Sequence, residues 1–220
     1  GIELAKKHDQ FASLVELYRL RQSAQRISFA PTTNEDELNY QDSLKAVENL
    51  ERSIHYNHLY RKIINLVQAD SLSKHERGHI INDILNHPSL FVTNTANEPY
   101  KSFLLRNRII TSCYYFSGRW EAAISTTIEQ LKGMPNFEEG SDHNKRNIMV
   151  ALGDLVTLYQ GTFDRTNYST TIKRMEDYAK DESAFFALKK ANLEMGLNMF
   201  KQDNGWLSGN LNESIEIGTE

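Results

Sequence analysis

Three aromatic residues recur at a fixed interval of 43 residues in the second half of the 220-residue chain: Trp120, Phe163 and Trp206. Each stands two positions after a residue that favours turns, namely Gly118, Gly161 and Asn204. A fixed interval of this size is typical of architectures in which helix pairs stack as repeats. We therefore expect stacked helical units in this half, with the aromatic side chains wedged between paired helices.

The spacing of apolar residues predicts an all-α chain. Residues 11–27 follow helical spacing, and so does a long segment from about 36 to 68. At 1.5 Å per residue the second helix would measure roughly 45 to 50 Å, so we expect a partner element to pack along it. Its apolar stripe consists of Tyr40, Leu44, Val47, Leu50, Ile54, Leu59, Ile63, Leu66 and Val67.

The rest of the chain divides into a short helix, an irregular segment and regular helix pairs. Ser71 or Ser73 precedes a helix that ends near Leu85, and residues 87–99 are irregular. We therefore place one region over 1–99 and repeats with a 43-residue period over 100–220, the last one truncated. The predicted pairs are 101–117 with 119–132, 145–160 with 165–179, and 183–201 with 206 to the end.

Charge and composition exclude several classes of protein. The net charge of −4 and the pI near 6.0 give no electrostatic reason to expect nucleic acid or an anionic membrane as a partner. No apolar run approaches the length of a membrane span. The single cysteine, Cys113, is expected to be a buried small hydrophobe. Both ends of the chain fall inside apolar patterns, so we expect a piece of a longer, cytoplasmic protein.

The segment 114–124, YYFSGRWEAAI, resembles a tetratricopeptide repeat. Such a repeat has an aromatic near the end of its first helix, a turn glycine, a second aromatic, a small alanine and a closing proline. Tyr114, Gly118, Trp120, Ala123 and Pro135 occupy those places. The resemblance implies right-handed antiparallel helix pairs that form an α-solenoid. The departures from the pattern are Asn107, Thr111 and Thr127 in the first unit and Thr166 in the second.

In that family the first helix of each pair lines a concave groove that binds a peptide or a partner helix. Carried over to this chain, the groove would present Leu105, Arg108, Ser112, Tyr115, Glu194, Asn198 and Lys201. The middle unit offers Ile148, Ala151, Leu155 and Leu158 instead, which look like packing residues. The groove lacks the recurrent basic or Asn-rich lining that clamps a peptide carboxylate. These positions are equally compatible with ordinary surface and core.

The letters H-E-x-x-H occur at His75, Glu76 and His79, and Glu98 follows where thermolysin-like aminopeptidases have a third zinc ligand. On one helix face the two histidines could hold zinc while the glutamate activates water. Arg77 and Gly78 count against this interpretation, because those families keep the first place uncharged and glycine weakens a helix. No strand-rich region precedes the motif either. We therefore expect an exposed helix with two solvated histidines.

The sequence thus favours a non-enzymatic interaction scaffold that uses no cofactor and binds a protein or peptide. One alternative is a peptide-sensing regulatory segment of a larger protein. A remote alternative is a zinc metallopeptidase through His75, Glu76, His79 and Glu98. His55 and His58, three residues apart, are expected to be surface or helix-interface residues. Replacing Trp120 with alanine should cost roughly 3 to 5 kcal/mol if it is a wedge.

Overall fold

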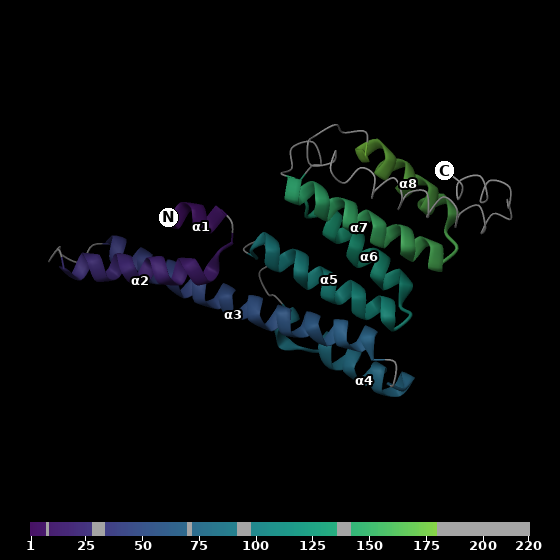
Figure 1. Cartoon of the computed structure of the whole chain (residues 1–220), viewed down its shortest axis with the longest axis horizontal. Helices are drawn as coiled ribbons and strands as arrows, with labels where there is room; N and C mark the ends of the chain where they lie inside the picture. Colours follow the sequence, from purple (N-terminus) through teal and green to yellow (C-terminus); the bar gives the residue numbers. More distant parts are fainter. Residues whose placement is uncertain (8, 28–33, 70–71, 92–97, 136–141, 180–220) are drawn as a thin grey trace. The chain divides into compact units, whose positions relative to one another are not determined.

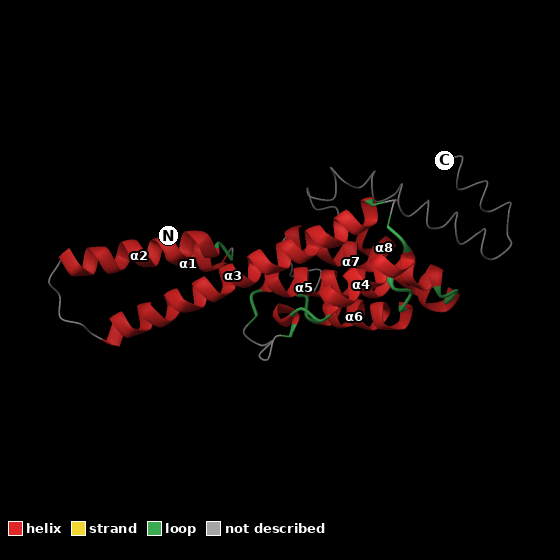
Figure 2. Ribbon diagram, turned by 90° about the horizontal axis from the view of Figure 1, so that it is seen from below, coloured by secondary structure: helices red, strands yellow, loops and turns green. Residues whose placement is uncertain are grey.

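The computed structural model describes residues 1–7, 9–27, 34–69, 72–91, 98–135 and 142–179 (Figure 1). Within these ranges every regular element is helical, which confirms the predicted all-α class (Figure 2). The elements are α1 (Ile2–Lys7), α2 (Phe11–Ile27), α3 (Asn34–Gln68), α4 (Lys74–Leu85), the 3-10 helix η1 (Pro88–Leu90), α5 (Tyr100–Phe116), α6 (Trp120–Lys132), α7 (Asp142–Gly161) and α8 (Arg165–Ala179).

The predicted helices are confirmed to within a few residues wherever the structure describes them. Helix α2 has the predicted bounds, α3 begins two residues before the expected start, and α5 to α8 correspond to the first two predicted pairs. The third pair, over 183–201 and from Trp206 onward, lies outside the described residues. So do Asn204 and the groove positions Glu194, Asn198 and Lys201.

The chain forms two compact units, Gly1–Cys113 and Tyr114–Glu220. The boundary falls inside α5, whereas the repeat pattern suggested a division between residues 99 and 100. The boundary between residues 99 and 100 marks where the sequence repeats are expected to begin, and it stays a prediction.

Among the described residues of the first unit, hydrophobic cores form toward each end of α3. The first core joins α1, α2 and the beginning of α3, and it contains Ala5, Phe11, Leu14, Tyr18 and Ala46. The second core joins the other half of α3 to α4, η1 and α5 through Tyr56, Leu59, Ile63, Leu66, Ile81, Ile84, Leu90, Ile109 and Cys113. Helix α3 is long because a different set of helices covers each of its halves (Figures 1 and 2).

Only part of the predicted stripe of α3 is covered. Leu59, Ile63 and Leu66 are buried and Leu50 is partly buried. The expectation that a partner element packs along α3 is confirmed by α2, but part of the predicted stripe stays uncovered because its residues lie at different angles around the helix. The residues that remain exposed are Tyr40, Leu44, Val47, Ile54 and Val67.

Helix α4 begins at a capping box, as expected for Ser73. The Ser73 hydroxyl accepts the backbone N–H of Glu76, and the Glu76 carboxylate accepts the backbone N–H of Ser73 at 2.9 Å. Two backbone donors that the helix leaves unpaired are satisfied in this way. The Arg77 guanidinium donates to the carbonyls of Leu72 and Ala69, which ties the start of α4 to the segment that follows α3.

In the second unit α7 packs against both α6 and α8 (Figure 1). A helix covered on two sides needs apolar residues around most of its circumference. The buried residues of α7 include Ile148, Ala151, Leu155 and Leu158, which confirms their predicted packing role. Helices α6 and α8 bury narrower faces, with Ala123 and Thr127 on α6 and Tyr168, Ile172 and Met175 on α8.

Two helix connections of the second unit have the same backbone geometry, 45 residues apart. Gly118 (φ 71°) and Phe163 (φ 58°) are left-handed, and each lies two residues before the next helix begins. In both turns the left-handed residue and its successor donate backbone hydrogen bonds to the last turn of the preceding helix. These bonds are Gly118–Tyr115 and Arg119–Tyr114 in one turn, Phe163–Gln160 and Asp164–Tyr159 in the other. This is the Schellman arrangement that ends many helices.

The turn between α1 and α2 repeats this arrangement in the first unit. Asp9 has φ 49°, its N–H donates to Lys6, and the N–H of Gln10 donates to Ala5. Helix α2 then begins at Phe11, again two residues after the left-handed position. Three of the described connections therefore share one three-residue turn.

The 45-residue register corrects two details of the sequence alignment. Gly161 is the last residue of α7, and the left-handed position of its turn belongs to Phe163. The equivalent of Ala123 is Tyr168 rather than Thr166, and both Ala123 and Tyr168 are buried whereas Thr166 is exposed. The 43-residue aromatic interval therefore joins positions that differ in structure.

No helix in the described ranges is both long and apolar enough to span a membrane.

Candidate functional site

Trp120 and Phe163 have different environments although the sequence pattern pairs them. The Trp120 indole meets the Tyr115 ring edge to face, with 5.1 Å between centroids. It also lies over Gly161, where an added methyl group would come within 3.1 Å of the ring. Trp120 thus packs the turn after α5 against the end of α7, which supports its predicted wedge role. Gly161 provides the space for this close approach.

Phe163 does not act as a wedge, contrary to the prediction. Its side chain is 73% exposed, and its backbone is left-handed. A bulky residue rarely adopts that conformation, which costs roughly 1 to 2 kcal/mol because Cβ approaches the following carbonyl oxygen. The prediction failed because the 43-residue interval aligns Phe163 with Trp120, which is the first residue of α6. Phe163 instead lies in the turn before α8. An exposed aromatic side chain is therefore held in a strained turn.

Tyr115, Phe116, Trp120 and Phe163 together define the turn surface of the second unit. The Tyr115 ring meets that of Phe116 at 5.2 Å as well as that of Trp120, and Phe116 is 42% exposed. Trp120 joins the two turns by its contact with Gly161. Two aromatic side chains are thus anchored in the protein, while Phe116 and Phe163 face solvent.

The groove positions that the structure describes fall on α5. Leu105 packs against the second core of the first unit, and Ser112 is half-buried. Arg108 is exposed, with its guanidinium 5.5 Å from the centre of the Tyr60 ring. Tyr115 belongs to the second unit, where it contacts Trp120. A groove formed jointly by these residues stays a prediction.

The histidine motif lies on α4, as expected, but its acidic members have other partners. His75 and His79 share one helix face, with 4.9 Å between ring centroids, and both are exposed. Glu76 is held by Ser73 in the capping box, and its pKa is lowered by the hydrogen bonds from the Ser73 side chain and backbone. Among the described residues, no group of three or more His, Cys, Asp or Glu side chains is arranged to hold a metal ion.

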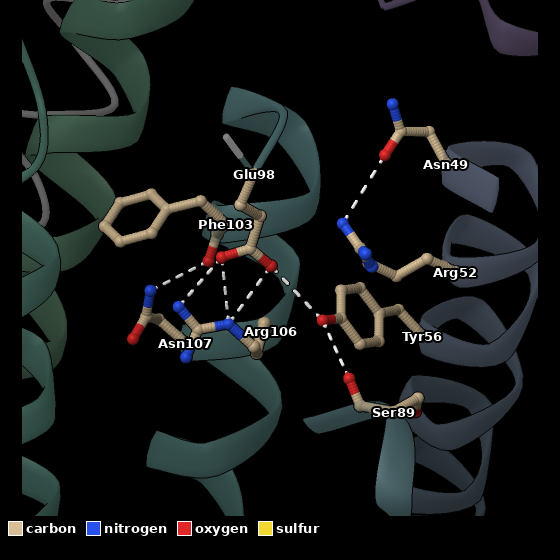
Figure 3. A network of polar contacts seen from close by, with 8 residues as sticks. All are labelled: Asn49, Arg52, Tyr56, Ser89, Glu98, Phe103, Arg106 and Asn107. Atoms are coloured by element: carbon tan, nitrogen blue, oxygen red, sulfur yellow. Dashed lines mark hydrogen bonds and ion pairs between the residues drawn. The ribbon is translucent and has the colours of Figure 1, made fainter. Parts of the chain in front are cut away.

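Glu98 lies at the centre of a polar network inside the first unit (Figure 3). Its side chain is fully buried, and it accepts bonds from the Arg106 guanidinium, with Nε at 3.0 and 3.1 Å and one terminal nitrogen at 2.9 Å. The Tyr56 hydroxyl of α3 lies 3.2 Å from the same carboxylate and 3.0 Å from the Ser89 carbonyl. The network therefore links α3, the 3-10 segment and the start of α5.

Burial governs the titration of two side chains in this core. Desolvation raises the pKa of the Tyr56 hydroxyl, and the neighbouring Glu98 charge raises it further. Burial also raises the pKa of the Cys113 thiol to about 12. The prediction that Cys113 is buried is confirmed, and a buried thiol lacks the accessible thiolate that a reactive cysteine needs.

His55 is a half-buried residue of α3, and its ring lies near that of His87, the residue before the 3-10 helix. The two rings are 5.7 Å apart, and His55 also lies 3.6 Å from Glu51. The pKa of His87 is lowered, mainly by burial and further by the charges of His55, Lys62 and His58. His58 is exposed. These positions agree with the interpretation of His55 and His58 as surface or interface residues.

Searches of family models, of curated proteins and of solved structures each found no match to this chain. The internal geometry of the molecule therefore carries the functional argument.

The network of Glu98, Arg106 and Tyr56 could not be recognised from the sequence. Glu98 stands out there only for its distance from the histidine motif, and that distance says nothing about burial. Arg106 occurs eight residues later, on a helix that begins at Tyr100, whereas Glu98 lies before that helix. Its partnership with Glu98 depends on how the chain enters α5, which apolar periodicity does not specify.

Proposed function

We propose that this chain is a non-enzymatic protein-interaction scaffold built from tetratricopeptide-like helix pairs. The turn surface would provide anchoring contacts for a partner protein or peptide. The groove positions Leu105, Arg108, Ser112 and Tyr115 would extend this contact along α5, with Glu194, Asn198 and Lys201 contributing from the last pair. A cytoplasmic location and partners other than nucleic acid belong to the same proposal.

The strained and exposed Phe163 is the observation that carries the proposal. Backbone strain of this kind persists where the surrounding structure overrides it, and it tends to gather at binding sites. A glycine or asparagine would fit the left-handed position with less strain. The side chain that causes the strain is largely exposed, so it contributes little to the core. Binding a partner would explain why a phenylalanine stands there.

The neighbours of Phe163 support a docking role. Phe116 is a second exposed aromatic on the adjoining turn, and Trp120 fixes the two turns against each other through Gly161. Aromatic residues that project from a rigid base are frequent among the side chains that dominate binding energy at protein interfaces. Such residues lose little conformational entropy when they bind. The turn surface has both properties.

The shared turn geometry supports the repeat architecture. The turns after α5 and α7 have the same hydrogen bonds 45 residues apart, and α7 packs against both α6 and α8. Consecutive helices that pack on their neighbours and are joined by short, equivalent turns are what helical-repeat proteins require. Solenoids of this type commonly present extended binding surfaces.

Affinity capture with the full-length protein tests the proposal, with Phe163→Gly as the decisive variant. This substitution removes the exposed ring and suits the left-handed backbone, so the fold should survive it. We expect at least one protein captured by the wild type to be lost from Phe163→Gly and retained by Lys173→Ala, an exposed change on α8. If the same proteins are captured by all three forms, Phe163 is not part of a binding site.

A further inference from the structure

Helix α3 has a second apolar face that no described part of the chain covers. Tyr40, Leu44, Val47 and Ile54 are 41 to 61% exposed. Their spacings of four, three and seven residues place them on one narrow stripe. Glu51 and His58 continue the same stripe. We call it the α3 seam, because a spacing of four and three is that of helices that pair as coiled coils.

The seam lies away from the face that holds the two cores. Ala46, Leu59 and Ile63 are buried on the core face. At 100° per residue each is turned by at least 100° from Tyr40, whereas the four apolar seam residues fall within roughly 80° of one another. Helix α3 therefore has an apolar stripe beyond the face that its neighbours cover, bordered on either side by the core residues Leu50 and Leu66, each about 80° from Tyr40.

Charges are distributed very unevenly along α3. Residues 34–51 contain six acidic residues and one basic residue, while residues 52–68 contain three basic residues, two histidines and no acidic residue. The helix dipole favours acids at the start and bases at the end, but this effect fades within the first and last turns. It does not account for Glu48, Glu51 and Arg52, which lie in the middle of a 35-residue helix.

Contacts among the residues that the structure describes use only some of these charges. Asp42 accepts from Lys6 of α1 at 2.9 Å. The exposed carboxylates of Glu37 and Glu51 contact Gln41 and His55 of α3 itself. Glu51 and His55 meet at the boundary between the acidic and basic halves of α3, but charges as far apart as those of Glu37 and Arg61 cannot meet within one straight helix. They can meet when two such helices lie antiparallel.

We propose that two copies of this chain associate through the α3 seam as an antiparallel helix pair. The two-fold axis crosses the seam at the level of position 49 along the helix, so each contact occurs twice, as in any isologous interface. In this register Leu44 faces Ile54 of the second copy, Tyr40 faces His58, and Glu37 faces Arg61. A parallel pair would instead place Glu37 against Glu37 and Glu51 against Glu51, which is repulsive.

Glu51 and His58 are the polar residues of this seam, and Glu51 faces Val47 of the second copy. A polar residue inside a coiled-coil seam lowers stability while it restricts the register and orientation. The proposed association is therefore moderate in affinity and strongly dependent on the complementary charges. The seam is on the first unit, and the association does not depend on the turn surface of the second unit.

Analytical ultracentrifugation of the full chain over a range of concentrations tests this association. We expect a monomer–dimer equilibrium that weakens as salt is raised from about 50 mM to about 500 mM, because exposed ion pairs are screened. Glu51→Leu should tighten the dimer by about tenfold, since it joins Tyr40, Leu44, Val47 and Ile54 into one uninterrupted apolar stretch of the seam. A protein that stays monomeric at several hundred micromolar would overturn the proposal.

Charge reversal distinguishes the antiparallel pair from any other arrangement. Arg61→Glu should raise the dissociation constant by about tenfold, a change of about 1.4 kcal/mol, because it faces Glu37. The double variant Glu37→Arg/Arg61→Glu should restore the wild-type value. Lys45→Glu is the matched control, an exposed reversal on the same helix outside the seam. Equal effects of Arg61→Glu and Lys45→Glu, or a double variant no better than Arg61→Glu, would contradict this register. Circular dichroism confirms that each variant keeps its helices.

Discussion

Glu98 is a buried carboxylate. Its charge is balanced by Arg106, and it also accepts a hydrogen bond from the Tyr56 hydroxyl. Removing one member of such a pair leaves the other charge uncompensated in the core. We expect Glu98→Ala to lower the free energy of unfolding by about 3 to 5 kcal/mol, measured by urea titration. Glu129→Ala, which breaks the exposed 2.7 Å pair with Lys132, is the control and should change stability by less than about 1 kcal/mol. Equal losses would show that burial is not the cause.

His87 should make stability depend on pH just below neutrality. Its pKa is lowered in the folded protein, so the unfolded chain takes up a proton at a higher pH than the folded one does. The contribution of His87 is fully present above the ordinary histidine value of about 6.5 and is lost as the pH falls through that value toward the lowered folded pKa. Protonation also opposes the hydrogen bond that the Ser89 N–H donates to His87 Nδ1.

We therefore expect the urea midpoint of the wild type to fall between pH 7 and pH 5.5 more than that of His87→Asn. His75→Asn, at an exposed position on α4, should keep the wild-type pH dependence. A His87→Asn protein with the full pH dependence would assign the titration to another group.

Trp120 and Phe163 should respond to substitution with opposite signs. Trp120→Ala removes contacts with Tyr115 and Gly161 and should cost about 3 kcal/mol, the lower end of the range for large aromatics because the indole is only half-buried. Phe163→Gly relieves a left-handed phenylalanine and should stabilise the protein by up to about 1 kcal/mol. Denaturant unfolding of both variants measures the difference. If Phe163→Gly instead lowers the free energy of unfolding by several kcal/mol, Phe163 does pack as a wedge.

At the scale of single elements, α4 depends on its start signal and tolerates a change in its middle. Ser73→Ala breaks the capping box and should cost about 1 kcal/mol. Gly78→Ala should instead stabilise by about 0.5 to 1 kcal/mol, because alanine favours the helix and a methyl group at this position meets no atom within 4 Å. Urea midpoints of the two variants should therefore move in opposite directions. A destabilised Gly78→Ala would mean that this helix needs the glycine.

The helices could be predicted from the sequence because their signals are local. The apolar spacing of residues 11–27 and the serine before α4 depend on neighbours within a few positions. The turn after α7 could not be predicted in this way. Its left-handed residue is a phenylalanine, and no local preference favours that choice over the glycine two positions earlier. Only the left-handed backbone at Gly118 and Phe163 shows that the turns after α5 and α7 are 45 residues apart.

Helix α3 shows a related limit of periodicity. Its apolar residues were correctly placed on a helix, but the sequence treated Tyr40 and Leu59 as members of one stripe. The structure assigns Leu59 to a core and leaves Tyr40 exposed. Over 35 residues a small change in the repeat length rotates the stripe around the helix. Apolar residues on different faces of α3 can therefore be mistaken for one stripe when only their spacing in the sequence is known.

At the scale of the whole molecule, the sequence predicted the class of the fold better than the candidate site. All-α structure follows from composition and periodicity along the chain. A binding site depends on which side chains remain uncovered after packing, and that is decided by contacts between helices. Phe163 entered the sequence analysis as a packing residue and emerged as the most exposed aromatic of the turn surface. Its strain and exposure together were visible only in three dimensions.

Site-specific photo-crosslinking in the full-length protein tests the central claim most directly. A photoreactive phenylalanine analogue at position 163 keeps the aromatic ring, and the same analogue at Lys173 on α8 serves as the control. The account predicts that irradiation in cells joins position 163 to another polypeptide, with little product at position 173. The absence of an adduct at position 163, or equal yields at the two positions, would contradict the claim that the turn surface is where this protein binds its partner.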